Sequence, residues 1–226
     1  MDTKFRERIK KLLIDLNIYD ENINIDTFCR ALTHSTYANE HKNVKDFQYL
    51  EFLGDSILQF LVSKEIYRLY PEYKEGRATQ HRSYAVNNKT LSEVSEKIGL
   101  SENILFSKNA FLNGKNEKIN SDFFEAFIAA IYLEKGLDFT DKFIKKHLKD
   151  YLLNEKIDKD PKTTFQELIQ LNGSCKIIYK TDFLEELGKF QSAIIVDNKK
   201  YGIGFGKTKK EAKENAAKNA LKSLNV

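Results

Sequence analysis

Two pairs of acidic residues lie within strongly apolar stretches of the chain. Glu51 and Asp55 belong to YLEFLGDSILQFL, and Asp122 and Glu125 belong to SDFFEAFIAAIYL. Spacings of four and three residues place each pair on one face of a helix. Burying an unpaired carboxylate among Phe, Leu and Ile is costly, so four such acids indicate a compensating cation. Oxygen ligands favour a hard divalent ion, with Mg²⁺ as the default.

The same acids have a simpler interpretation. Each pair can lie on an ordinary solvated helix face or be neutralised by a nearby lysine. The occurrence of two pairs in similar surroundings favours the metal site over this alternative.

The composition is that of a globular protein. The chain has 226 residues, 41% of them hydrophobic, which suits one large domain or two small ones. Charged residues interrupt the longest apolar runs well before the ~18 residues of a membrane helix, and MDTKFRERIKKLLIDL lacks a signal-peptide core. We therefore expect a cytoplasmic protein without a membrane segment. Cys29 and Cys175 have no partners at zinc-ligand spacing and are interpreted as passive thiols.

The net charge of +4 is unevenly distributed. Residues 159–226 carry 13 lysines and 8 acidic residues, a net charge of +5, whereas residues 1–158 carry 24 basic and 25 acidic residues. A small basic unit joined to a nearly neutral one suggests a binding module attached to a body that acts on what is bound.

The acid pairs must be positioned by helices, because the pattern up to about residue 150 is helical. Apolar periodicity predicts a long helix over about 48–70, which Pro71 stops. Gly136 is predicted to end a second helix. Further helices are predicted around 9–16, 88–98, 122–134 and 138–153.

After the polar stretch NEKIDKD the sequence period changes. Thr164 with Glu167 is interpreted as a capping box that opens the helix FQELIQLN. CKIIYK predicts a strand, and FQSAIIV and KYGIGFG predict two more around a turn at 197–199. Thr208 with Glu211 forms a second capping box before an alanine-rich helix. The predicted order is α-β-β-β-α.

A lysine cluster stands at the start of that last helix. Lys209, Lys210 and Lys213 share a face away from the alanines, where backbone amides and the helix dipole favour an anion. Alone, such a cluster is more often a solvated face. In context, DPKTTFQELIQ, the three-strand spacing and GFGKTKKEAKENAAKNAL resemble the double-stranded RNA-binding domain over residues 160–224.

This resemblance implies a three-part RNA surface. The first helix of the family enters one minor groove, the loop between the first two strands enters the next, and the lysines contact phosphates of the intervening major groove. Where the family usually has a Gly-Pro-x-His loop, this chain has LGKF at 187–190, a departure at the second contact. The residues implied to bind RNA are Thr163, Gln166, Glu167, Lys209, Lys210 and Lys213.

The helical domain is similar to ribonuclease III. YLEFLGDS at 49–56 resembles the family signature, and ALTHSTYAN, PEYKEG and SDFFEAFIAAIYLEKG match the family in order and spacing. With the RNA-binding domain, the resemblance covers the whole chain and implies a bacterial-type homodimeric enzyme that cuts double-stranded RNA. It assigns metal-binding and catalytic roles to Glu51, Asp55, Asp122 and Glu125, and a further cleft position to Glu75.

Gln48, just before the signature stretch, and Gly54, within it, are interpreted separately. Gln48 lies one helical turn before Glu51, where the family has an acid; glutamine keeps the shape and the hydrogen-bonding reach but loses the charge. Because the four central acids are intact, we interpret the chain as an active enzyme with an altered cleft edge. Gly54 gives up roughly 1 kcal/mol of helix propensity relative to Ala, which indicates either close approach of another group or a helix packing contact.

The chemistry agrees with the resemblance. Phosphodiester hydrolysis needs an activated water, relief of phosphate charge and help for the leaving oxygen, all of which Mg²⁺ can supply. We predict that Glu51, Asp122 and Glu125 bind the ion, that Asp55 and Glu125 are catalytic, and that Glu75 and Gln48 line the cleft or a second ion site. Mn²⁺ is expected to substitute.

The sequence thus predicts an all-α endonuclease domain at 1–153, a linker at 154–160 and an α+β double-stranded RNA-binding domain at 161–226. The expected activity is Mg²⁺-dependent cleavage of both RNA strands, leaving 5′-phosphate and 3′-hydroxyl ends and, as the family resemblance implies, short 3′ overhangs. The expected substrates are precursors of rRNA and other structured RNAs. Two rival hypotheses remain: a catalytically silent RNA-binding regulator, motivated by Gln48, and a helical metal-binding or scaffold protein.

Overall fold

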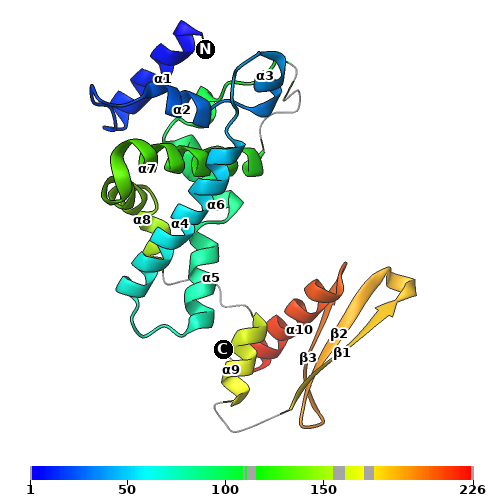
Figure 1. Ribbon diagram of the computed structural model, residues 1–226. Coiled ribbons are helices and arrows are strands. Elements are labelled where there is room, and N and C mark those ends of the chain that lie inside the picture. Colours follow the sequence, from blue (N-terminus) through cyan, green and yellow to red (C-terminus); the bar gives the residue numbers. More distant parts are fainter. Residues whose placement is uncertain (1, 109, 111–115, 155–160, 171–175, 225–226) are drawn as a thin grey trace. The chain divides into compact units, whose positions relative to one another are not determined.

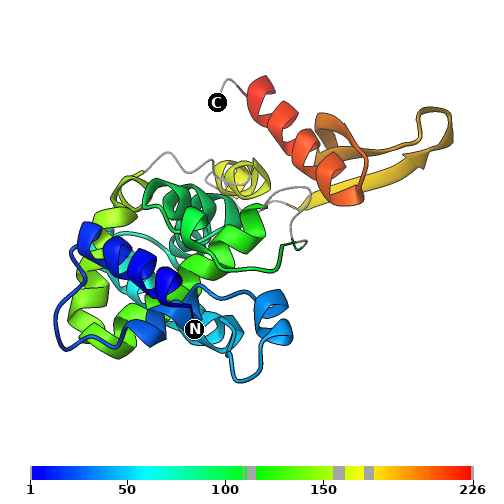
Figure 2. The ribbon, with the colours of Figure 1, turned by 90° about the horizontal axis from the view of Figure 1, so that it is seen from above.

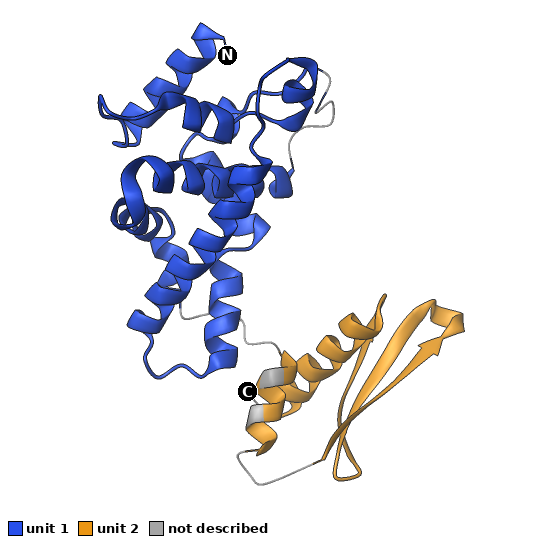
Figure 3. Cartoon of the chain, in the orientation of Figure 1, with its two compact units in different colours: residues 1–157 blue, residues 158–226 orange. Residues whose placement is uncertain are grey.

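The computed structural model describes residues 2–108, 110, 116–154, 161–170 and 176–224. For Thr163 and Glu167 it describes the backbone but not the side chains. The chain divides into two compact units, residues 1–157 and residues 158–226 (Figure 3). Each has an apolar core of its own. Residues 155–160 of the predicted linker lie outside the described residues, as does Cys175.

Unit 1 is helical, which confirms the all-α prediction (Figure 1). In the part of the chain that the structure describes, none of the helices combines the length and apolarity needed to span a membrane. The elements of unit 1 are α1 (Thr3–Asp15), α2 (Ile25–Ala31), α3 (Ser35–Glu40), α4 (Gln48–Leu69), α5 (Glu75–Ala85), α6 (Asn88–Lys97), the short 3₁₀ turn η1 (Ser101–Asn103), α7 (Glu117–His147) and α8 (Lys149–Leu152).

Helices α4 and α7 form the centre of this unit and pack against each other. Helix α4 ends one residue before Tyr70, as the position of Pro71 predicted. Gly136 breaks α7 with a φ of 76° and a ψ of 177°, a backbone conformation that costs glycine little. The turn of α7 that carries the acids also carries Phe123, Phe124 and Phe127, each 0% exposed, whose side chains belong to the core.

Three predicted helix limits are wrong, and one of them is the start of the helix expected at 122, which begins at Glu117. The helix expected over 138–153 is interrupted at Leu148, where α7 gives way to α8. In unit 2, the first helix α9 spans Pro161–Gln170, so Thr164 lies inside it and does not cap it. The reason is that proline is well suited to the first helical position, because it needs no amide donor there and its φ is already helical.

Unit 2 has the predicted α-β-β-β-α order. Strands β1 (Ile177–Leu184), β2 (Lys189–Val196) and β3 (Lys199–Gly206) form an antiparallel sheet in the order β1-β2-β3. The 3₁₀ turn η2 (Glu185–Leu187) joins β1 to β2. Asp197 and Asn198, both with positive φ, form the two-residue turn between β2 and β3, a typical hairpin connection.

Helix α10 (Lys209–Ser223) runs along one face of the sheet (Figures 1 and 2). The helix lies directly on the backbone of β3: a Cβ on Gly204 would come within 2.0 Å of the Ala216 nitrogen. On the helix side, the contact is made by small buried residues such as Ala216. Asn215 and Asn219 donate side-chain hydrogen bonds to carbonyls of β3, at 2.7 and 2.8 Å. The lysine-bearing end of α10 is therefore held rigidly against the sheet.

Candidate metal centre and RNA-binding surface

Gly54 sets how closely α4 approaches α7. A Cβ built on Gly54 would lie 1.8 Å from the carbonyl oxygen of Glu125 and 2.5 Å from its carbonyl carbon. Both are backbone atoms of α7 and cannot move aside as a flexible side chain can. Of the two interpretations that the sequence left open for Gly54, the structure favours the helix packing contact. That contact brings the acid-bearing turns of the two helices together.

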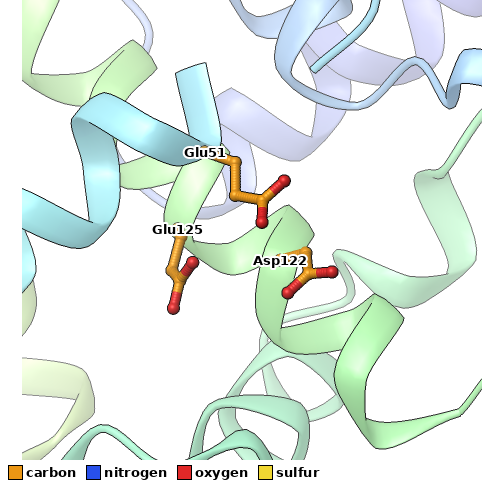
Figure 4. Close-up of side chains that lie close together, drawn as sticks. All are labelled: Glu51, Asp122 and Glu125. Atoms are coloured by element: carbon orange, nitrogen blue, oxygen red, sulfur yellow. The ribbon is translucent and has the colours of Figure 1, made fainter. Parts of the chain in front are cut away.

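Three carboxylates meet at this crossing (Figure 4). Glu51 projects from the first turn of α4, and Asp122 and Glu125 project from α7. One carboxylate oxygen from each lies within 4.8 Å of the other two, and all three residues are partly buried. The predicted ligands are thus close enough to share one small cation.

The pKa of Glu125 is raised from 4.5 to about 8. Burial is the main cause, and the charges of Asp55, Asp122 and Glu51 add to it. Burial also raises the pKa of Glu51, and there Asp122 is the largest charge contribution. The protein thus holds these carboxylates in a position that penalises their negative charge, which a divalent cation would relieve.

Asp55 lies one turn after Glu51 on α4 and is partly buried. Its Oδ1 accepts a hydrogen bond from Gln59 Nε2 at 3.3 Å. After burial, its charge is the largest contribution to the raised pKa of Glu125, so the two acids face the same space. Asp55 does not belong to the three-carboxylate cluster, and a role near the attacking water, as ligand or base, stays a prediction.

A lysine that the sequence reasoning missed adjoins the cluster. Lys118 Nζ donates to both carboxylate oxygens of Asp122, at 2.9 and 3.0 Å. Their i,i+4 spacing on α7 is the signal that could have revealed the pair. The residue before Asp122 is also fixed, because Ser121 Oγ donates to Asn88 Oδ1 of α6 at 3.2 Å.

The donor set fits a hard divalent ion. It consists of carboxylate oxygens alone, the type of ligand that Mg²⁺ and Mn²⁺ prefer to sulfur or imidazole. The number of acids exceeds the positive charge that Lys118 brings, and the neighbouring acids add to the burial that raises the pKa of Glu125. The residues therefore suit a metal ion of charge two.

The structure places the predicted cleft residues outside the cluster. Gln48 is the first residue of α4 and is exposed, and its backbone N–H donates to Asp46 Oδ1 at 3.1 Å. Glu75 begins α5 and accepts a hydrogen bond from Thr79 Oγ1 at 3.2 Å. Glu75 also lines an open cavity of about 410 Å³ between α4 and α5.

One face of α4 carries exposed aromatic residues. Tyr49, Phe52, Phe60 and Tyr67 are 73%, 69%, 55% and 82% exposed. Their spacing of three, eight and seven residues places them along one side of the helix. Phe60 and Tyr67 also line the cavity that Glu75 borders. Four large aromatic side chains exposed along one side of a helix form an apolar surface, so this face suggests a partner.

In unit 2 the lysines lie where the sequence predicted. Thr208 caps α10 as predicted, and its side chain accepts a hydrogen bond from the Glu211 N–H at 3.1 Å. The Glu211 carboxylate accepts from the N–H of Lys207 at 2.6 Å, one residue before the N-cap, so the reciprocal bond of a capping box is displaced by one residue. Lys209 and Lys210 are exposed in the first turn, and Lys213 is partly exposed one turn later. This end of the helix combines a positive dipole with three side-chain charges.

The other RNA-binding surfaces are only partly visible. Gln166 is exposed on α9, whereas the side chains of Thr163 and Glu167 lie outside the described residues. The β1–β2 connection has Leu187 60% exposed and Gly188 at a φ of 58°. At its base, Phe183 and Phe190 pack edge to face at 4.9 Å. The connection therefore combines two exposed acids, Glu185 and Glu186, with an exposed leucine where the family usually has Pro and His.

The comparisons with known proteins agree with both units. Residues 24–152 match the family described as Ribonuclease-III-like, and residues 161–224 match the double-stranded RNA binding motif. The protein named Ribonuclease 3 from Mycoplasma mobile is 43% identical over 206 residues, 89% of this chain and 84% of that protein. Ribonuclease 3 from Clostridium perfringens is 41% identical over 202 residues, 86% of this chain and 85% of that protein.

A solved structure resembles the helical unit. The nuclease domain of ribonuclease III from Campylobacter jejuni superposes with a TM-score of 0.57 at 28% sequence identity, covering 63% of this chain and 97% of that one. That study describes structural flexibility in a region involved in dimer formation of the domain.

Proposed function

Since the chain belongs to the ribonuclease III family, we propose that it cleaves RNA with Mg²⁺ bound by Glu51, Asp122 and Glu125. The chain is a hydrolytic endoribonuclease of double-stranded RNA, with a nuclease domain followed by a double-stranded RNA-binding domain. The observation that supports the metal site is the meeting of three carboxylates within 4.8 Å at a position where burial raises the pKa of two of them. We propose domain limits of 1–153 and 161–226 with a linker at 154–160.

The four acids divide between two roles. Glu51, Asp122 and Glu125 hold and orient the ion through their oxygens. When bound, the ion supplies charge neutralisation for the phosphate and activation of a water. Asp55, beside the ligands and facing Glu125, accepts the proton of the attacking water. Glu125 has a pKa raised to about 8, so its ionisation depends on the positive charge of the ion.

The proposed reaction predicts the ends of the products. With Mg²⁺, each cut is expected to leave a 5′-phosphate and a 3′-hydroxyl, and cuts in the two strands are expected to be offset to leave short 3′ overhangs. Mn²⁺ is expected to replace Mg²⁺. The measurement is enzymatic end-labelling of products from a defined duplex, with and without prior phosphatase treatment. Products with 2′,3′-cyclic phosphates would show that the RNA itself supplies the nucleophile, and would contradict hydrolysis by an activated water.

The cleft edge of the proposed site differs from that of the family. Gln48 and Glu75 are proposed to contact RNA or a second ion at the rim. An acid at position 48 would add negative charge where phosphates must pass, whereas glutamine keeps a donor and an acceptor there. We propose an active enzyme whose metal requirement and substrate choice are tuned by this substitution. Cytoplasmic processing of rRNA and other structured precursors is the proposed biological role.

The RNA-binding domain is proposed to contact the duplex through two surfaces. Thr163, Gln166 and Glu167 on α9 contact one minor groove. Lys209, Lys210 and Lys213 at the start of α10 contact phosphates. The support for the second contact is the exposure of Lys209 and Lys210 at a capped helix N-terminus. Backbone amides at such a terminus favour phosphate binding together with the lysines.

Removing the three α10 lysines should weaken duplex binding and its salt dependence. Log affinity falls linearly with log salt, and each lost phosphate contact makes this slope shallower by roughly 0.9. For the Lys209→Gln, Lys210→Gln, Lys213→Gln variant, the slope is therefore expected to be shallower by up to about 2.7. Filter binding over a potassium chloride series measures this. The matched control replaces Lys176, Lys199 and Lys200, which are exposed near the β2–β3 turn. Equal slopes for both variants would place the phosphate contacts elsewhere.

We propose that the chain is a homodimer formed through the aromatic face of α4. In a two-fold symmetric interface the same patch is used by both copies, and the exposed rings of Tyr49, Phe52, Phe60 and Tyr67 would be covered together. The cavity beside Phe60 and Tyr67 is of a size to accept an aromatic side chain from the partner.

Charge in the middle of this face should separate the dimer. Phe52→Asp is expected to sediment as a monomer where the parent sediments as a dimer, because two desolvated carboxylates would face an apolar surface. The substitution is in an exposed side chain, so helical content should not change. As a control, Leu153→Asp removes another exposed apolar side chain outside α4 and should leave the dimer intact. A parent that sediments as a monomer at micromolar concentration would contradict the proposal.

A further inference from the structure

The ammonium of Lys118 already occupies oxygens that the proposed metal needs. Its Nζ lies 2.9 Å from Oδ1 and 3.0 Å from Oδ2 of Asp122, so both oxygens of that carboxylate accept hydrogen bonds from one cation. Glu51 and Glu125 also raise the pKa of Lys118, which places its charge beside the whole cluster. Conversely, burial raises the pKa of both Glu51 and Glu125, and the charge of Lys118 offsets part of that rise.

The position of Lys118 is unfavourable for the helix itself. α7 begins at Glu117 after the N-cap Asn116, so Lys118 stands in the first turn. A positive charge there is repelled by the positive end of the helix dipole, and acidic residues are preferred. The side chain is 66% exposed and buries little surface. Its local benefit is therefore the pairing with Asp122.

The pair is weak enough to be opened. Ion pairs of exposed lysines contribute little to stability, and an i,i+4 pair on a helix contributes only tenths of a kcal/mol. Asp122, by contrast, is only 15% exposed and cannot turn to solvent as readily as the lysine can. The ammonium can therefore leave Asp122 while the carboxylate stays in the cluster.

We propose that Lys118 is a built-in counter-cation that competes with the divalent ion for Asp122 and thereby sets the metal concentration at which the enzyme works. This inference rests on the proposed metal site at Glu51, Asp122 and Glu125. In the metal-free protein the ammonium offsets part of the negative charge of the cluster. Metal binding displaces it from at least one Asp122 oxygen, and the displaced positive charge stays close enough to repel the ion.

The test measures Mn²⁺ binding directly, by electron paramagnetic resonance of the full chain without RNA. Lys118→Met keeps the length of the side chain and removes the charge, and it is expected to lower the Mn²⁺ dissociation constant about three- to tenfold at low ionic strength. Because the repulsion acts through solvent, the gain should shrink in about 0.5 M potassium chloride. Lys118→Arg keeps the charge and is expected to bind Mn²⁺ within about twofold of the parent.

Lys142→Met is the matched control, since it removes an exposed lysine from α7 beyond the break at Gly136 and should leave the dissociation constant unchanged. Equal or weaker Mn²⁺ binding by Lys118→Met would overturn the role of Lys118, as would a gain that persists unchanged at high salt. A parent that binds no Mn²⁺, while its double-stranded RNA binding is intact, would instead overturn the metal site itself. The two failures are therefore distinguishable. Thermal melting of each metal-free variant verifies that it is folded.

Discussion

Glu125→Gln is expected to abolish cleavage and to leave duplex binding intact. Glutamine keeps the size of the side chain but cannot supply the negative charge that holds the ion. We expect single-turnover cleavage to fall about a thousandfold or more, equivalent to ~4 kcal/mol in the barrier. Binding should stay within about twofold, because the lysines proposed to contact phosphate lie on α10 in the other unit. Cleavage is measured on a labelled duplex already bound by excess protein.

The matched control for this substitution is Glu102→Gln, which neutralises an exposed acid in η1 and should not change the rate. A Glu125→Gln variant that cuts within about tenfold of the parent would show that the catalytic centre lies elsewhere, since the barrier would then have changed by less than ~1.4 kcal/mol.

The same variant should be more stable than the parent in the absence of metal. Burial raises the pKa of Glu125 in the folded state to about 8, well above the ordinary value of 4.5, so folding favours the protonated form. The stability that this provides is fully present below pH 4.5 and is lost as the pH rises to about 8. Glutamine is neutral at every pH, so the variant does not lose this stability as the pH rises. In EDTA, the melting temperature of Glu125→Gln should therefore exceed that of the parent at pH 8 by more than it does at pH 5.

Gly54→Ala is expected to separate the acid-bearing turns of α4 and α7. Alanine improves helix propensity by roughly 1 kcal/mol, but its Cβ would lie 1.8 Å from the Glu125 carbonyl oxygen. Neither backbone can yield locally, so the helices must move apart, and overpacking of this kind costs about 3 kcal/mol. We expect a net loss of stability in chemical denaturation and a loss of cleavage of at least about a hundredfold.

Gly76→Ala provides the matched control. Gly76 lies in α5, and a Cβ there would meet no atom within 4 Å, so this substitution should be neutral or slightly stabilising. If Gly54→Ala matched Gly76→Ala in both stability and rate, close packing of α4 on α7 would not be what assembles the site.

The sequence was most predictive where the information is local. The apolar run that ends at Pro71 fixes the limits of α4, and the order of the elements after the linker follows from period and turn residues. The acid pairs could be assigned to helix faces from their spacing alone. The family resemblance then indicated that the acids of the two helices belong to one site, which periodicity alone cannot indicate.

The features of the fold and site that the sequence did not predict depend mainly on contacts between residues far apart in the chain. That Gly54 meets the carbonyl of Glu125, 71 positions later in the chain, is a property of helix packing, so the sequence left its role open. Thr164 was wrongly predicted to cap α9, because the sequence pattern of a capping box does not show whether Pro161 starts the helix earlier. The pairing of Lys118 with Asp122 is local, and its spacing alone could have indicated it.

The central claim is that metal held by the acids of α4 and α7 cuts duplex RNA that the chain has bound. The most direct test adds Mg²⁺ to the metal-free full chain already bound to a duplex labelled on both strands. The prediction is that neither strand is cut before Mg²⁺ is added and that both are cut afterwards. A bound duplex that stays intact with Mg²⁺ and with Mn²⁺ would contradict the claim, and would favour a catalytically silent RNA-binding regulator.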